Sequence, residues 1–142
     1  MDLDLPQAAG QFFLLLQADL FARIKAAGFD DVRPRHGAVL AYIGADGRRV
    51  SEIAELSGQH KQVVSVVADE LEELGYVERR PDPSDGRAKL LVPTARGEAQ
   101  IRAAREIIRT IEQEIGSAIG GHRLESMKAS IADALEVLRT ER

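Results

Sequence analysis

Frequent breaks confine residues 35–93 to short secondary-structure elements. Glycines and turn-forming residues gather at positions 44–47, 57–58, 75 and 81–87. Because such residues interrupt helices and strands, the longest helix that fits between them covers residues 61–74. The stretch must therefore fold as a compact assembly of several short elements.

The pattern between these breaks predicts three short helices and a hairpin. The helices are expected at residues 37–43, 51–56 and 61–74, with Ser51 as the N-cap of the second. Two strand-like runs follow at 76–80 and 89–92, and Asp85-Gly86 between them is a favoured hairpin turn. A helix-turn-helix followed by a two-stranded hairpin is the outline of a winged helix-turn-helix.

Longer helices are expected on both sides of this region, at residues 3–27 and from 94 to the end. Each carries an apolar stripe at helical spacing, for example Phe13, Leu16, Leu20 and Ile24. A small central core cannot cover both stripes, whereas packing against a second copy buries them with two-fold symmetry. We therefore predict a mainly α protein with a small β-hairpin (α+β). Its expected parts are an N-terminal dimerisation helix at 1–33, a winged helix-turn-helix at 34–97 and C-terminal dimerisation helices at 98–142.

Composition narrows the class of protein. The chain is 44% hydrophobic and 30% charged, as is typical of globular proteins, and it has no cysteine for a disulfide or a thiolate metal site. No apolar run reaches the length of a membrane span, and the acidic start lacks the basic region of a secretory signal. We expect a cytoplasmic protein without a membrane partner. The net charge of −4 argues, taken alone, against a nucleic-acid partner.

The distribution of charge favours duplex DNA nonetheless. In the third helix, Lys61, Gln62 and Ser65 lie near the start, and acidic residues crowd the end. The first turns of such a helix enter the major groove. Residues 76–97 contain five basic and three acidic residues, and Arg87 follows the hairpin turn, where a guanidinium suits a narrow minor groove. Asp85 is placed to orient Arg87 through a bidentate ion pair.

Residues 34–97 resemble the MarR family of bacterial regulators. The most specific part is the pattern D-P-x-D-x-R-A followed by a strand and T-x-x-G, which is formed by Asp82, Pro83, Asp85, Arg87, Ala88, Thr94 and Gly97. The flanking helices match the family only in length and pattern. Two positions depart from it, because Val66 stands where many members have arginine, and Gly86 where a second basic residue is common. Either the contact made by that arginine is absent here, or Val66 contacts a thymine methyl group instead.

The resemblance implies an obligate homodimer that binds a pseudo-palindromic site on double-stranded DNA. It further implies that the chain is a repressor released by a small-molecule effector. The expected DNA-binding residues, from the pattern and the resemblance together, are His60, Lys61, Gln62, Ser65, Arg79, Arg80, Asp85, Arg87 and Lys89. By family position alone, an effector pocket would be lined by Phe12, Leu16, His36, Val39, Leu40 and Ile43, although these residues fit a core and dimer contact equally well.

Two other classes of function have to be compared with this one. An enzyme is not expected, since no phosphate-binding loop or nucleophile motif occurs. His122 and Glu125 could share a helix face, but a metal site needs three or four ligands, so neither a metal nor a cofactor is predicted. The main alternative is a winged-helix adaptor that binds proteins and not DNA, which would suit the acidic net charge.

Overall fold

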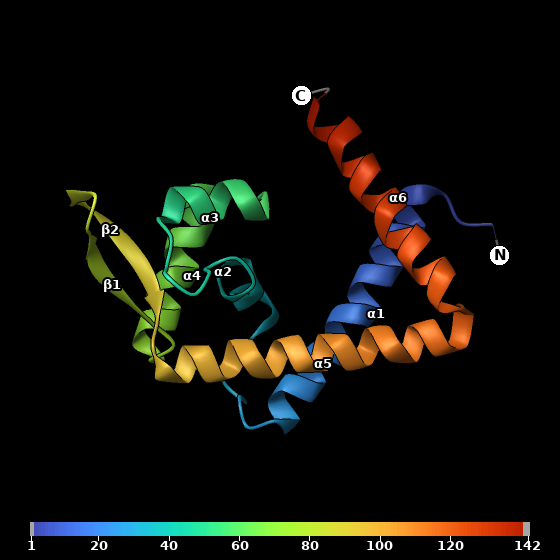
Figure 1. Cartoon of the computed structure of the whole chain (residues 1–142), viewed down its shortest axis with the longest axis horizontal. Coiled ribbons are helices and arrows are strands. Elements are labelled where there is room, and N and C mark those ends of the chain that lie inside the picture. Colours follow the sequence, from blue (N-terminus) through green and yellow to red (C-terminus); the bar gives the residue numbers. More distant parts are fainter. Residues whose placement is uncertain (1, 141–142) are drawn as a thin grey trace. The chain divides into compact units, whose positions relative to one another are not determined.

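The computed structural model describes residues 2–140 and divides by packing into two compact units, residues 1–105 and 106–142 (Figure 1). The first unit contains the short helices and the hairpin, and the second contains the helical C-terminal part. The fold is mainly helical with one two-stranded antiparallel sheet, which confirms the predicted fold class.

The N-terminal helix α1 spans Leu5–Ala26, close to its predicted extent. It begins at a reciprocal cap. The Asp4 carboxylate accepts a hydrogen bond from the Gln7 N–H at 2.9 Å, and the Gln7 amide oxygen accepts one from the Asp4 N–H at 3.1 Å. Among the described residues of α1 only Ile24 is buried. Several large apolar side chains are exposed instead, namely Leu5, Phe12, Phe13, Leu14 and Leu15.

Four short helical segments follow, and the first three differ from the prediction. A 3₁₀ turn, η1, spans Pro34–His36, and α2 covers only Gly37–Leu40. Helix α3 spans Val50–Ser57, so its N-cap is Arg49 and not Ser51. Glu52 accounts for this start, because its carboxylate accepts a 3.2 Å hydrogen bond from the Arg49 N–H. Helix α4 spans Lys61–Glu73, as predicted within one residue.

The hairpin consists of β1, Val77–Asp82, and β2, Asp85–Pro93. The pairing runs from Val77↔Pro93 to Asp82↔Asp85, so the turn falls on Pro83-Ser84. The predicted turn at Asp85-Gly86 is therefore wrong. Its cause is Asp82, whose side chain accepts hydrogen bonds from the Ser84 N–H at 2.9 Å and the Ser84 hydroxyl at 2.8 Å, which closes the chain earlier.

The core of the first unit lies where these short elements meet. Helices α2, α3 and α4 pack on one another, and β1 packs on α4 (Figure 1). Each element contributes side chains with almost no exposed surface. The most completely buried apolar side chains there are Ile24, Val39, Ile43, Ile53, Val64, Leu71, Tyr76, Val77 and Leu91.

Helices α5, Ala95–Ile119, and α6, Gly121–Thr140, form the C-terminal part, and the boundary between the units falls within α5. Inside the second unit, Lys128 binds Glu112 across the two helices at 2.5 Å. Ile111 and Leu124 are buried, but much of the α6 stripe is exposed, including Ile131, Leu135 and Leu138. None of the helices within residues 2–140 has the length and apolarity needed to cross a membrane.

Candidate nucleic-acid interface

Helix α4 has one buried side and one exposed side along its whole length. Val64, Val67, Ala68 and Leu71 are buried. Lys61 and Gln62 are exposed and Ser65 is half-buried, so the predicted contact residues are at or near the surface. Val66 is 57% exposed, which places the residue that departs from the family pattern on the open side as well. His60 occupies the N-cap position, but its side chain makes no capping hydrogen bond.

The acidic end of α4 is engaged in ion pairs with neighbouring elements. Arg79 on β1 donates to Glu72 at 2.7 Å and to Asp69 at 2.8 Å. Glu70 accepts from Arg35 Nε and interacts with His36 Nε2, both at 2.8 Å. The hydrogen bonds from Arg35 and then from His36 lower the pKa of the Glu70 carboxyl. These partners account for acids that the helix dipole alone would disfavour.

His36 links α4 to η1 through both of its ring nitrogens. Its side chain is 1% exposed, and Nδ1 accepts a 2.9 Å hydrogen bond from the Arg33 N–H. Because Nδ1 acts as an acceptor, a neutral ring carries its proton on Nε2 and donates it to Glu70. His36 thus fills a packing and bridging position.

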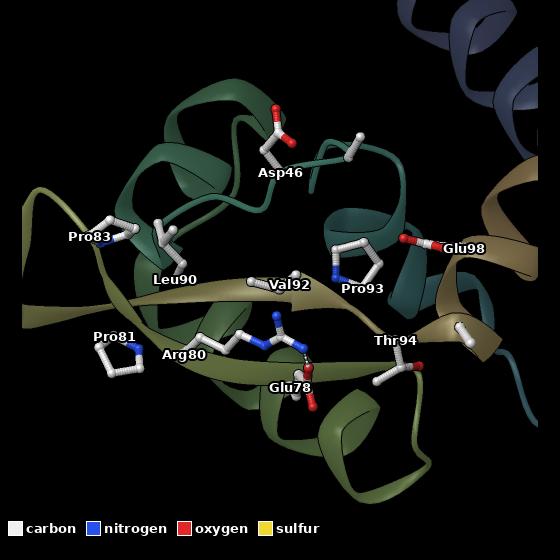
Figure 2. Close-up of a pocket in the computed structure, with 12 residues that line it drawn as sticks. Asp46, Glu78, Arg80, Pro81, Pro83, Leu90, Val92, Pro93, Thr94 and Glu98 are labelled. Atoms are coloured by element: carbon white, nitrogen blue, oxygen red, sulfur yellow. Dashed lines mark hydrogen bonds and ion pairs between the residues drawn. The ribbon is translucent and has the colours of Figure 1, made fainter.

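The other residues of the predicted effector pocket lie in two kinds of surroundings. Val39, Leu40 and Ile43 are buried, Leu16 is half-buried and Phe12 is 40% exposed. None of them lines the pocket in Figure 2. Their role in binding an effector stays a prediction.

The hairpin arginines separate into paired and unpaired side chains. Arg79 is held by the acids of α4, and Arg80 pairs with Glu78 on the opposite face of the same strand. Arg87 and Lys89 are exposed, and within residues 2–140 neither side chain has an ion-pair partner. Lys61 shares this property. Within residues 34–97, the cations with neither an ion pair nor a side-chain hydrogen bond are therefore those at the start of α4 and on β2.

Asp85 does not form the expected ion pair with the Arg87 guanidinium. Its carboxylate instead accepts a 3.1 Å hydrogen bond from the Arg87 backbone N–H. An aspartate readily turns back onto the backbone two residues later. Asp85 therefore shapes the chain at Arg87 and leaves the guanidinium exposed.

A pocket of about 640 Å³ lies against the outer face of the hairpin. Figure 2 shows the Glu78–Arg80 pair on its floor beside Leu90 and Val92, with Asp46 and Glu98 at its edges. This arrangement turns Arg80 toward the pocket, whereas Arg79 on the other face reaches α4. Among the described residues, no three acidic or histidine side chains come close enough together to hold a metal ion.

Two features of the wing motif have structural explanations that the sequence did not provide. The Thr94 hydroxyl donates to the Gly75 carbonyl at 2.6 Å and accepts from the Gly97 N–H at 3.2 Å, which caps α5. A Cβ at Gly97 would lie 2.0 Å from the Tyr76 carbonyl oxygen, so only glycine fits. The motif T-x-x-G thus joins α5 to the start of β1.

Arg49 was missed by the sequence reasoning. It donates to Asp82 through Nε at 2.8 Å and through a terminal nitrogen at 2.7 Å. The Ser84 backbone N–H and hydroxyl, and then Arg49, lower the pKa of Asp82 to about 2. The partners are 33 residues apart, and no local pattern marks such a pair.

A short-helix core with an exposed second helix and an adjoining hairpin defines a winged helix-turn-helix protein. Residues 30–88 match the model of the MarR family, which confirms the resemblance found in the wing motif. A comparison with curated protein sequences gives no match.

Solved structures with the same fold extend over nearly the whole chain. The transcriptional repressor CouR bound to a 23-mer DNA duplex is 23% identical, with a TM-score of 0.78 and coverage of 95% of this chain and 99% of CouR. MepR from S. aureus in a DNA complex is 21% identical, with a TM-score of 0.80 and coverage of 96% and 99%. A MarR-family transcriptional regulator from Rhodococcus sp. RHA1 is 23% identical, with a TM-score of 0.66 and coverage of 92% and 95%. These likenesses show the fold.

Proposed function

We propose that this protein is a sequence-specific DNA-binding transcriptional regulator. The observation that carries the proposal is the division of the cations of α3, α4 and the hairpin into two groups. One group forms ion pairs within the protein and comprises Arg49, Arg79 and Arg80. Lys61, Arg87 and Lys89 are exposed without such partners, and unpaired cations are the side chains that can neutralise phosphates.

In this proposal the start of α4 enters the major groove and the hairpin lies along the backbone and minor groove. Gln62 is the candidate for direct base reading, since an amide can bond adenine N6 and N7 together. Ser65 and His60 are candidates for contacts to bases or phosphates. The structures of CouR and MepR with DNA support this arrangement by fold.

We propose further that the active form is a homodimer on a pseudo-palindromic site. The support is the exposed apolar surface on α1 and α6, including Phe13, Leu15 and Leu138, each more than half exposed. Such side chains gain about 25 cal/mol for every Å² removed from water, and a second copy would provide the cover. Residues 1–33 and 98–142 are the proposed dimerisation parts.

Release from DNA by a small effector is the finer part of the proposal. It rests on the resemblance, and S. aureus MepR has also been solved bound to ethidium bromide. Phenolic and lipophilic compounds should be screened for release of a labelled duplex, with fluorescence anisotropy as the readout. Compounds that release DNA should bind the free protein too, and this binding should weaken when Leu16 is changed to serine.

The decisive experiment is selection of bound sequences from random duplex DNA by the purified protein. We expect an enriched motif with two-fold symmetry and half-site centres about 10 bp apart, or a whole number of helical turns. Binding should fall steeply with salt. Absence of both enrichment and salt-sensitive binding would favour the adaptor function instead.

A further inference from the structure

The base of the hairpin is fixed to the rest of the unit through the backbone. The Arg48 N–H donates to the Leu91 carbonyl at 3.0 Å, and the Leu91 N–H donates to the Arg48 carbonyl at 2.8 Å. Gly47 permits this approach, since its φ is +85° and a Cβ there would lie 2.7 Å from the Leu91 carbonyl oxygen. The loop before α3 therefore holds β2 at Leu91.

Toward the tip of the hairpin from Leu91, one side-chain ion pair joins the hairpin to the rest of the protein. Within the described part of the chain, the Arg49–Asp82 pair is the only hydrogen-bonded link from residues 82–89 to an element outside the hairpin. Asp82 is only 8% exposed. One of its oxygens accepts both bonds from Arg49, and the other accepts both bonds from Ser84. The carboxylate thus joins the turn of the hairpin to a fixed cation.

The far end of this link is the start of α3. Arg49 is the N-cap of α3, and its backbone N–H is itself bound by Glu52. The contact thus joins the hairpin tip to the start of the helix-turn-helix. Arg87 lies four residues before Leu91, toward the tip of the hairpin, which is roughly 13 Å along an extended strand. A tilt of about 10° at Leu91 would move Arg87 by about 2 Å, enough to break a hydrogen bond.

We propose that Arg49 and Asp82 are positioning residues that hold Arg87 where it meets DNA. The inference rests on the proposed DNA-binding function. The change in DNA affinity that it predicts for Asp82 variants is opposite to the change expected from charge alone. A carboxylate near DNA repels phosphates, so removing the charge of Asp82 should strengthen binding if charge alone mattered. If Asp82 instead holds Arg87 in place, removing its charge should weaken DNA binding.

The test is a double-mutant cycle between Asp82→Asn and Arg87→Ala, measured on the selected duplex. Asparagine has one acceptor oxygen and cannot serve Arg49 and Ser84 together. We expect Asp82→Asn to weaken binding about tenfold, the effect of losing about one charge-assisted contact. In the Arg87→Ala background it should have no further effect, because nothing remains to be positioned. Arg49→Lys, which keeps the charge and loses the two-pronged geometry, should show a smaller loss than Arg49→Gln.

A matched control separates position from general stability. Asp31→Asn removes a similar pair, with Arg96, at the other end of the hairpin. It should lower the melting temperature and leave the DNA affinity of the folded protein unchanged. The positioning inference is overturned if Asp82→Asn binds DNA as tightly as the wild type or more tightly, or if its effect adds fully to that of Arg87→Ala. The proposed DNA-binding function would still stand. If the wild type shows no salt-dependent binding to DNA, the proposed function falls with it.

Discussion

The Tyr76 hydroxyl donates a 2.5 Å hydrogen bond to one oxygen of Asp31, and Arg96 binds the other oxygen at 2.8 Å. The Arg96 guanidinium also lies 4.3 Å from the centre of the Tyr76 ring, and the ring has no exposed surface. Asp31 follows α1, Tyr76 precedes β1 and Arg96 lies in the first turn of α5. The cluster therefore fastens three separate segments at the base of the hairpin.

Alkaline pH should weaken this cluster. Burial and the hydrogen bond to Asp31 raise the pKa of Tyr76 from 10.0 to about 12. Between these values the unfolded chain has lost the tyrosine proton and the folded chain has kept it, so stability falls as pH rises. Tyr76→Phe lacks this dependence and should cost about 1 kcal/mol at neutral pH. Urea denaturation of both proteins between about pH 9 and 11 should show the difference narrowing. A constant difference would contradict the pKa shift.

Gly97→Ala should destabilise the first unit. The new Cβ would lie 2.0 Å from the Tyr76 carbonyl oxygen, and backbone must move to admit it. A loss of about 2–3 kcal/mol is expected from such overpacking, measured by chemical denaturation. Gly10→Ala is the control, because Gly10 lies within α1 with no atom near the added methyl. It should gain about 0.5–1 kcal/mol.

Arg79 and Arg87 should behave differently in DNA binding, although the sequence places both in the predicted interface. Arg87→Gln should lower the slope of log K against log salt by about 1, because one phosphate-neutralising cation is lost. Arg79→Gln should leave the slope near that of the wild type and cost about 0.5–1 kcal/mol of stability, since Arg79 is bound to Asp69 and Glu72. Equal changes in slope would show that Arg79 leaves its partners for DNA.

Gln62→Ala should affect base preference more than salt dependence. We expect a loss of about 1–3 kcal/mol on the best site, with relaxed preference at one position in each half-site. On scrambled DNA the variant should bind like the wild type. A uniform loss on all sequences would instead assign Gln62 to the phosphates.

The oligomeric state is testable by sedimentation. We expect twice the chain mass at micromolar concentration. Replacing both Leu135 and Leu138 on α6 with serine should shift the protein toward monomer. Leu56→Ser is the control, because Leu56 on α3 is exposed to a similar extent, 46%, and lies outside the proposed interface. A monomeric wild type would contradict the dimer proposal.

Helix positions could be predicted from the sequence because apolar spacing and breaks are local signals. The extents of α1 and α4 and the presence of the hairpin followed from such signals. The position of the turn did not, because Asp85-Gly86 is a strong turn dipeptide and Asp82 closes the chain earlier through contacts to Ser84. Arg49 also binds Asp82, and a contact across 33 residues leaves no local signal in the sequence.

The electrostatic roles were only partly predictable for the same reason. A run of basic residues in the hairpin is visible in the sequence, but its division into bound and unbound side chains depends on tertiary neighbours. Arg79 binds Glu72 and Asp69 on α4, another element of the fold, and only the Arg80–Glu78 pair is local in sequence. The acids that crowd the end of α4 are visible in the sequence, but their partners on β1 and η1 are not: Asp69 and Glu72 bind Arg79, and Glu70 binds Arg35.

Strand β1 pairs with β2 on one side only, and in the described residues its other side has no strand partner. An open strand edge can recruit the edge of another molecule and start aggregation. Here that edge carries Arg79, Arg80 and Pro81. Proline lacks the N–H that a new ladder would need, and two adjacent arginines would face their copies across it. When two such hairpins come close, the same residues oppose their joining into one continuous sheet.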